Sequence, residues 1–431
     1  MSQVLEQRDA LTADFEEFRR DPAFGGGALG RAREAGLARF RALGFPTTRL
    51  EEWKHTSLAP LAEAPFVRAS TDHVTPQLLE PFLFGEAPAH VVVVNGRLSR
   101  SLGSGLIPEG VTIDTGAGES ALGDAVNLDE VPYPFASLNT AFFDDAIVIR
   151  VAPGAVVPTP IHVLFVAAPG GRRTGCATRL IVRAGDRSQV AVVESYAGVG
   201  EGVSLTNAVS EFALGEGAMV DHVKVQRESL ASFHLAATFV RLSRSSTFTS
   251  HAITFGGRIA RNDIHAVLDG EGAECTLNGL YLADGDSLVD THTTIDHAKP
   301  HCPSHEVYKG ILAGRSRAVF NGKIIVRQDA QKTDAKQTNK AMLLGPDATI
   351  NTKPQLEIFA DDVKCTHGAA IGQLDEDQLF YLRARGIGET DARSMLIHAF
   401  AGQVVDGIKT AAVRERVMQV MEDKLQLAHQ G

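Results

Sequence analysis

The sequence predicts a mainly β protein, a β-solenoid core between helical segments. From about Pro88 onward, short β-branched runs such as HVVVVNGRL, AIVIRVA and QVAVVESY replace helical periodicity. Turn-like clusters rich in Gly, Asp and Ser separate these runs. They lie around Gly154, Gly185, Gly215, Ser243, Gly270, Gly314 and Gly345. A repeat of about 30 residues with two strands per unit is typical of a solenoid, in which each coil buries its apolar face against its neighbours.

The turn spacing separates the solenoid from a β-sandwich. Successive intervals between the clusters are 31, 30, 28, 27, 44 and 31 residues, so only the step from Gly270 to Gly314 departs from the period. A large sandwich, the alternative, has turns about every 8–12 residues. The observed spacing favours the solenoid.

Helical segments are expected on both sides of this core. Near the N-terminus, Leu37, Phe40 and Leu43 lie at helical spacing, and Gly44 with Pro46 supplies a stop. After Gly372 the helical period returns in three short amphipathic segments. These are too small to form a core alone, so they are expected to pack on the β-core, on a partner, or on both.

Capping residues define the first C-terminal helix. Asp375 and Gln378 form an N-cap and capping box, and Gly386 is expected to end the helix in a left-handed conformation. The next two helices are expected to carry one apolar face each. These faces consist of Ala392, Met395, Leu396 and Ala399, and of Val413, Val417, Val420 and Leu425.

Composition limits the functional classes. The chain has 42 basic and 52 acidic residues, a formal charge of −10, which argues against general nucleic-acid or anionic-membrane binding. Four scattered cysteines form no C-x-x-C pair, which fits a reduced cytoplasm. The polar, acidic N-terminus lacks the pattern of an export signal, and the apolar runs are strand-length. No phosphate-binding loop, dinucleotide fingerprint or nucleophile elbow is present.

Cys365 and His367 are the leading candidates for chemistry. In a strand, side chains at positions i and i+2 point to the same face, so this thiol and imidazole are placed to reach one soft metal or sulfur species. A C-x-H pair by itself is a weak signal, because most free cysteines are buried packing residues. Cys176 and Cys275 lie in strand-like apolar surroundings and are expected to be such core residues.

A second cluster, DHAKPHCPSH, brings His297, His301, Cys302 and His305 close together in sequence. Metal binding requires these groups to converge, yet two prolines break the segment, so polar contacts on an interface loop are the favoured interpretation. A metal-dependent hydrolase built on the three histidines is the main alternative function. A solenoid carbohydrate enzyme is a further alternative, but its carboxylates, Asp361 and Asp362, are adjacent and are expected to face opposite sides of a strand.

Two segments resemble a known family. The run from Tyr308 to Ile387, including FNGKIIVRQDAQKTDAKQTNKAMLLGPDATINTKPQLEIFADDVKCTHG, strongly resembles the SufB/SufD scaffold proteins of SUF iron-sulfur cluster assembly. GFPTTRLEEWKHTSL, residues 44–58, resembles the opening of the SufD branch. Two details favour that branch: C-T-H-G at residues 365–368, where SufB has H-E-A, and Leu382, where SufB carries a cysteine.

The resemblance implies a fold, partners and a site. The fold is a right-handed parallel β-helix, with a helical domain at 1–87, a β-helix core at 88–372 and a C-terminal helical domain at 373–431. The implied role is a non-enzymatic scaffold that pairs with SufB and docks the ATPase SufC through its C-terminal helices. It shares a transient iron-sulfur cluster or iron through His367, with Cys365 as a secondary candidate. Reduced flavin belongs to the complex as a whole, and a homodimer is the alternative when SufB is absent.

The polar stretch 322–340, GKIIVRQDAQKTDAKQTNK, is interpreted as part of the contact between the two scaffold subunits. Its Gln, Thr and Asn content suggests hydrogen-bonding side chains along a sheet, and the resemblance places it near that contact. Strand pairing of this kind supplies main-chain hydrogen bonds and register.

Overall fold

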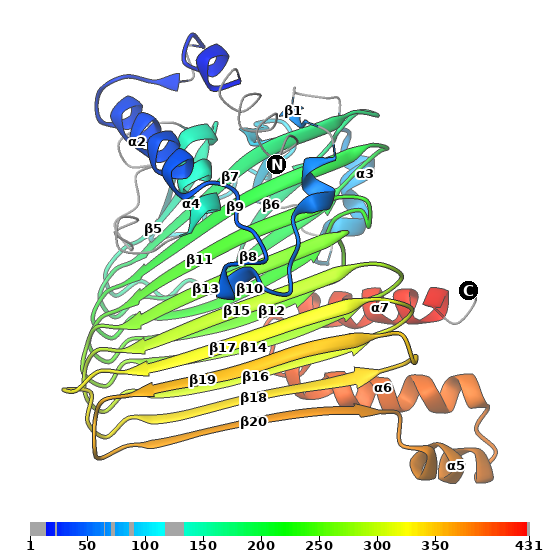
Figure 1. Ribbon diagram of the computed structural model, residues 1–431. Helices are drawn as coiled ribbons and strands as arrows, with labels where there is room; N and C mark the ends of the chain where they lie inside the picture. The colour runs from blue at the N-terminus through cyan, green and yellow to red at the C-terminus, as the bar shows by residue number, and fades with distance from the viewer. Residues whose placement is uncertain are drawn as a thin grey trace.

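The computed structural model describes residues 14–21, 24–63, 65–69, 74–85, 90–116 and 133–428. Within these ranges a parallel β-solenoid runs from residue 146 to residue 373, and helices lie before and after it (Figure 1). This confirms the predicted fold class. The parallel pairing between successive coils excludes the sandwich.

Two long sheets form the solenoid, and each coil contributes one strand to each sheet. The odd-numbered strands of the first sheet, sheet A, are β5 (Ala146–Val151), β7 (Arg173–Ala184), β9 (Val203–Leu214), β11 (Phe233–Leu242), β13 (Ile259–Leu268), β15 (Leu288–His297), β17 (Arg317–Val326) and β19 (Thr349–Ile358). The even-numbered strands of the second sheet, sheet B, are β6 (Ile161–Ala167), β8 (Gln189–Gly198), β10 (Met219–Arg227), β12 (Thr247–Thr254), β14 (Glu274–Ala283), β16 (Pro303–Leu312), β18 (Asp334–Leu343) and β20 (Lys364–Gln373).

The register confirms the sequence period. Ile259, Leu288 and Arg317 are neighbours on β13, β15 and β17, a step of 29 residues each time. The 44-residue interval from Gly270 to Gly314 arose because the predicted series combined two kinds of turn. The turns at Gly154 to Gly270 lead from sheet A to sheet B, whereas those at Gly314 and Gly345 lead back from sheet B to sheet A.

Two further turns lead from sheet A to sheet B and were not found in the sequence. They contain His301 and Lys332. Backbone φ is positive at one residue of each of these corners: Gly154, Arg187, Gly217, Ser245, Gly272, His301 and Lys332. Glycine fits this left-handed conformation without strain, but four of the seven positions carry a side chain. Because the turn recurs with non-glycine residues, a search for Gly-rich clusters could not follow the series.

At six of these seven corners, from Arg187 to Lys332, the next residue is small and buried. These residues are Ser188, Ala218, Ser246, Ala273, Cys302 and Thr333, all no more than 1% exposed. Their stacking fills the inner corner of the solenoid, where close packing leaves no room for a larger side chain. Cys302 is therefore a member of a packing column, and its thiol donates a hydrogen bond to the carbonyl of Gly270 at 3.3 Å.

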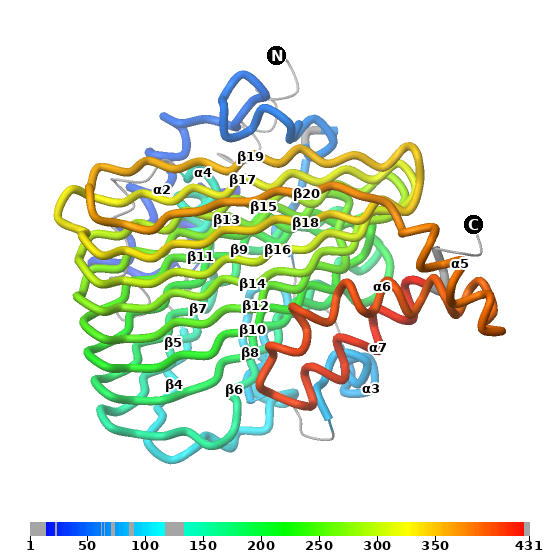
Figure 2. Tube along the Cα trace, turned by 90° about the horizontal axis from the view of Figure 1, so that it is seen from below, coloured from blue at the N-terminus to red at the C-terminus, as the bar shows by residue number. Residues whose placement is uncertain are grey.

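The first coil is covered, whereas the last coil is open. β4 (Val111–Gly116) pairs antiparallel with β5, and β2 (Val91–Val94) extends sheet B beside β6 and forms a hairpin with β3 (Arg97–Leu98). β19 and β20 have no strand beyond them in the described ranges (Figure 2).

The N-terminal region contacts both sheets. α2 (Gly27–Leu43), the 3-10 helices η2 (Glu51–Trp53) and η3 (Ala59–Ala62), and β1 (Val67–Arg68), which pairs with β7, lie on the side of sheet A. α3 (Pro76–Leu79) and the 3-10 helix η4 (Glu80–Phe82) pack beside β2 and β6 of sheet B. α4 (Pro134–Phe142) packs between α2 and sheet A. Gly44 ends α2 with positive φ, as predicted. Residues 1–13 and other parts of the predicted 1–87 domain lie outside the described ranges.

Three helices follow the solenoid: α5 (Glu376–Ala384), α6 (Glu389–Val405) and α7 (Ala411–Ala428). α6 and α7 pack on the outer face of sheet B, and α5 packs against α6 (Figure 2). The Asp375 side chain accepts hydrogen bonds from the backbone N–H groups of Asp377 and Gln378, and Gly386 has positive φ, so both caps are confirmed. The division into domains at residues 87 and 372 remains a prediction.

The predicted face of α6 is wrong in part. Met395 is 50% exposed and Ala399 is also exposed, whereas Ile397, Ala401 and Val404 are buried. The sequence pattern included Ala392 correctly, but it assigned the rest of the face to residues that point away from sheet B. On α7, Val413, Val417 and Leu425 are buried as expected.

Candidate functional sites

Cys365 and His367 lie on β20, the last strand of the solenoid. Their register neighbours on β18 are Ala335 and Gln337, which face the solenoid interior. Because register neighbours in a parallel sheet share a face, both candidate side chains belong to the inward face, as the i, i+2 spacing predicted. No further coil covers them in the described chain, and His367 is exposed.

The open last coil exposes groups that are buried elsewhere in the solenoid. All seven residues of β6 are buried, whereas none of the ten residues of β20 is. Ile358, Phe359 and Ile371 are 40%, 63% and 51% exposed. The outer edges of β19 and β20 also present unpaired backbone groups, which are a template for another strand. We call residues 349–373 the open end.

A buried polar pair lies directly beneath His367. The Gln337 amide donates a hydrogen bond to the Glu306 carboxylate on β16 at 2.6 Å, and the two side chains are 2% and 1% exposed. Burial raises the pKa of Glu306 to about 7. Gly322 provides the room, because a Cβ there would lie 2.0 Å from the Gln337 amide nitrogen. The interior directly beneath His367 therefore contains a polar pair, which sequence analysis did not predict.

The Cys365 thiol is partly buried, and burial raises its pKa. A metal ligand must be a thiolate, so this environment disfavours the binding form until a metal or a cation is near. In the described part of the chain, no three His, Cys, Asp or Glu side chains are grouped so as to hold a metal ion. The ligand roles of Cys365 and His367 therefore remain predictions.

The histidines of the second cluster do not converge. His297 is fully buried at the end of β15, where its Nε2 lies 3.0 Å from the Ser304 hydroxyl. His301 occupies the left-handed corner position, and His305 lies on β16 beside the inward-facing Ser304 and so points to the opposite face. The described residues therefore give no support to the metal-dependent hydrolase.

The remaining sequence candidates have structural roles. Cys275 is fully buried in the core, and burial raises the pKa of both Cys176 and Cys275. Asp361 and Asp362 lie in the corner turn between β19 and β20, so the expectation that they face opposite sides of a strand is wrong. Asp362 forms an ion pair with Lys332 in the preceding corner.

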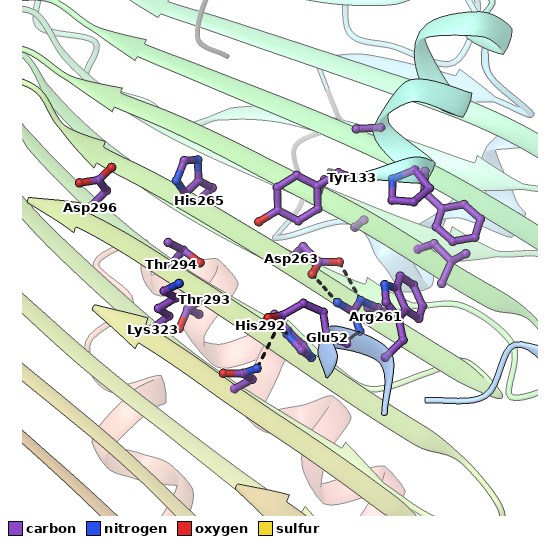
Figure 3. A pocket seen from close by; sticks show the side chains of 18 of the residues that line it. Glu52, Tyr133, Arg261, Asp263, His265, His292, Thr293, Thr294, Asp296 and Lys323 are labelled. Atoms are coloured by element: carbon purple, nitrogen blue, oxygen red, sulfur yellow. Dashed lines mark hydrogen bonds and ion pairs between the residues drawn. The ribbon is translucent and has the colours of Figure 1, made fainter. Parts of the chain in front are cut away.

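A cavity of about 460 Å³ lies on the outer face of sheet A, and sequence analysis missed it (Figure 3). Its floor consists of outward-facing side chains on β13, β15 and β17, with Asp263, His292 and Asn321 in register across the three strands. η2 and the start of α4 form its walls. The only available signal was the recurrence of polar residues at a step of 29, and it is visible only once the register is known.

The EEW segment of the family-like N-terminal motif is bound to sheet A at this cavity. Glu52 lies 3.2 Å from Nδ1 of His292, and the guanidinium of Arg261 lies 3.8 Å from the centre of the Trp53 ring. Arg261 also contacts Asp290 at 2.6 Å. Burial lowers the pKa of His292, but the Asp290 charge and hydrogen bonds to Asp290 and Glu52 outweigh it, and the pKa rises to about 9.

The helices after the open end carry an exposed apolar surface. Phe380 and Tyr381 on α5 are 74% and 58% exposed, and Met395 on α6 is 50% exposed. Leu379, by contrast, is buried. No helix in the described ranges has the length and apolar character required to cross a bilayer.

These features define a parallel β-solenoid protein with helical flanks and one open end. A family model described as the SUF system FeS cluster assembly SufBD core domain matches residues 165–400. An iron-sulfur cluster assembly SufBD family protein of Synechocystis sp. is 34% identical over 396 residues, which cover 88% of this chain and 87% of the relative. The chain belongs to the SufBD family.

Relatives named SufD are also similar over most of their length. The iron-sulfur cluster assembly protein SufD of Escherichia coli is 30% identical over 384 residues, covering 89% of this chain and 90% of the relative. SufD of Bacillus subtilis is 25% identical over 310 residues, covering 70% and 69%. The family resemblance seen in the sequence is thereby confirmed.

Proposed function

We propose that this chain is a scaffold subunit of a complex of the SufB–SufC–SufD type in the cytoplasm. It pairs with SufB through its open end and contributes to nascent cluster assembly and iron acquisition there. The observation that carries the proposal is the unfinished last coil. Its unpaired strand edges and exposed Ile371 need a partner, and the same strand holds Cys365 and His367.

His367 is the proposed ligand for iron or the nascent cluster. Only a neutral imidazole coordinates a metal, so protons compete with the metal for this side chain. Cys365 is the secondary candidate, because its partly buried thiol must first lose a proton. The cluster is cargo shared with SufB. Reduced flavin, if bound by the complex, has no assigned site in this chain.

SufC is the proposed source of ATP hydrolysis, and this chain is not proposed to be an enzyme. The exposed side chains of α5 and α6, Phe380, Tyr381 and Met395, are the proposed docking surface. Large exposed apolar groups on a short helix are typical of partner contacts. When SufB is absent, a symmetric homodimer through the same open end is the expected alternative.

Maturation of an iron-sulfur reporter enzyme in vivo, with SufB and SufC present, tests the site. His367→Ala is expected to lower reporter activity about tenfold or more, as loss of a metal-site residue typically does. Its stability is expected to be unchanged, because the side chain is exposed. Cys365→Ala is expected to have an intermediate effect.

Cys302→Ala is the matched control. It removes a buried thiol of the packing column two coils below the last one, so reporter activity is expected to remain while stability falls slightly. Wild-type reporter activity with His367→Ala, in a complex that assembles normally, would leave the subunit a purely structural partner.

A further inference from the structure

The cavity on the outer face of sheet A has no part in the proposed function. It lies on the side of the solenoid opposite the C-terminal helices, and its lining includes neither Cys365 nor His367. A volume of about 460 Å³ is within the range of small-molecule sites. The geometry points to a binding site for an uncharged organic molecule that joins a flat ring to several hydroxyl or N–H donors, the chemistry of a nucleoside.

The charges around the cavity are already paired. Arg261 contacts Asp263 at 2.7 Å and Asp290 at 2.6 Å, and His292 contacts Asp290 at 3.0 Å. Farther along the floor, Lys323 lies 2.7 Å from Glu357, and Arg327 lies 2.6 Å from Asp296. A charged ligand competes with these pairs, whereas an uncharged ligand leaves them intact.

Two polar atoms in the lining lack the partners that buried groups normally have. The Asn321 side chain is 5% exposed and donates through Nδ2 to Glu52 at 3.3 Å, which leaves its Oδ1 as an acceptor without a donor among the described residues. His265 Nδ1 is likewise unpartnered there. Burial lowers the pKa of His265, so its ring is neutral and can accept a hydrogen bond. Hydroxyl or N–H groups of a ligand satisfy both atoms.

The wall at α4 supplies the contact for a ring. Tyr133, Pro134 and Phe135 line the cavity, and Tyr133 extends over the strands between His265 and Asp263 (Figure 3). Aromatic faces favour flat heterocycles over aliphatic chains. A nucleoside combines such a ring with a hydroxylated tail and has no net charge, which matches the wall, the unpartnered atoms and the charge balance together.

The test is calorimetric titration of the full chain with adenosine, guanosine, cytidine and uridine, and in parallel with adenosine 5′-monophosphate and ribose. At least one nucleoside is expected to bind. Asn321→Leu and His265→Phe are each expected to weaken that binding about fivefold, as expected for loss of one uncharged hydrogen bond. Ribose, which lacks the ring, and the monophosphate, which adds charge, are expected to bind more weakly than the nucleoside.

Asn351→Leu is the control, since Asn351 is exposed on β19 and lies outside the cavity. His367→Ala is a second control, and unchanged binding in it separates this inference from the proposed function. Failure of all four nucleosides to bind overturns the inference. Tighter binding of the monophosphate, or equal binding by wild type, Asn321→Leu and His265→Phe, overturns it as well.

Discussion

The two ends of the solenoid follow the same coil geometry but are finished differently. The first coil is covered by β4 on sheet A and by the β2–β3 hairpin on sheet B, and every residue of β6 is buried. The last coil ends in β19 and β20, and no residue of either strand is buried. A solenoid end normally needs a cap to protect its apolar interior and its strand edges. The difference therefore supports the proposal that another chain pairs with the open end.

Ile371→Glu is expected to have the largest effect on pairing with SufB through the open end. Ile371 is 51% exposed on the inward face of β20, beside buried Ala341 on β18. A carboxylate there must be desolvated by any partner that completes the coil, so affinity for SufB is expected to fall about 100-fold, as for an unpaired charge in an interface. Analytical ultracentrifugation with SufB measures the change. Thr366→Glu, on the opposite face of the same strand, is the control and is expected to have the smaller effect.

Phe380→Asp tests whether the C-terminal helices and the open end bind different partners. Phe380 is 74% exposed, so the free chain is expected to keep its stability, while binding to SufC is expected to weaken about tenfold or more. Surface plasmon resonance with immobilised SufC measures this. Glu415→Ala, on an exposed position of α7, is expected to bind normally. If Phe380→Asp instead weakens only SufB binding, the two surfaces have been assigned to the wrong partners.

A pH dependence of stability is expected at His292, which contacts Glu52 of the N-terminal segment on sheet A. The folded-state pKa of about 9 is above the ordinary value of 6.5, so the stabilisation is complete below pH 6.5 and is lost as pH rises toward 9. Its size is on the order of 1–3 kcal/mol. Urea unfolding at pH 6.5 and pH 9 measures it. His292→Gln is expected to lose this part of the pH dependence, and an unchanged slope would contradict the role of the ion pair.

The sequence predicted the repeat well because a solenoid is governed by local periodicity. Turn residues such as Gly154 and Gly314, and caps such as Asp375, act through their own backbone and can be found without knowing the fold. The corner at His301 was missed as a turn and was considered as a metal cluster. A non-glycine residue with positive φ carries no signal in its identity, and only the register reveals it.

The candidate sites, like the turns, could be predicted only where the signal is local in the sequence. The placement of Cys365 and His367 on one face follows from strand alternation, which two residues are enough to define. The cavity beside His292 could not be predicted, because Glu52, Asp263 and Asn321 come from three distant segments. The polar pair of Gln337 and Glu306 was hidden for a related reason, since alternation identifies an inward position but not a polar interior.

Hydrogen exchange of the backbone amides, with and without SufB, tests the central claim most directly. In the free chain, amides at the outer edges of β19 and β20 are expected to exchange quickly, while those of β13 and β15 in the middle of the solenoid are protected. Addition of SufB is expected to protect residues 349–373 and to leave the middle coils unchanged. Protection that appears elsewhere on the chain while residues 349–373 still exchange freely would contradict the account.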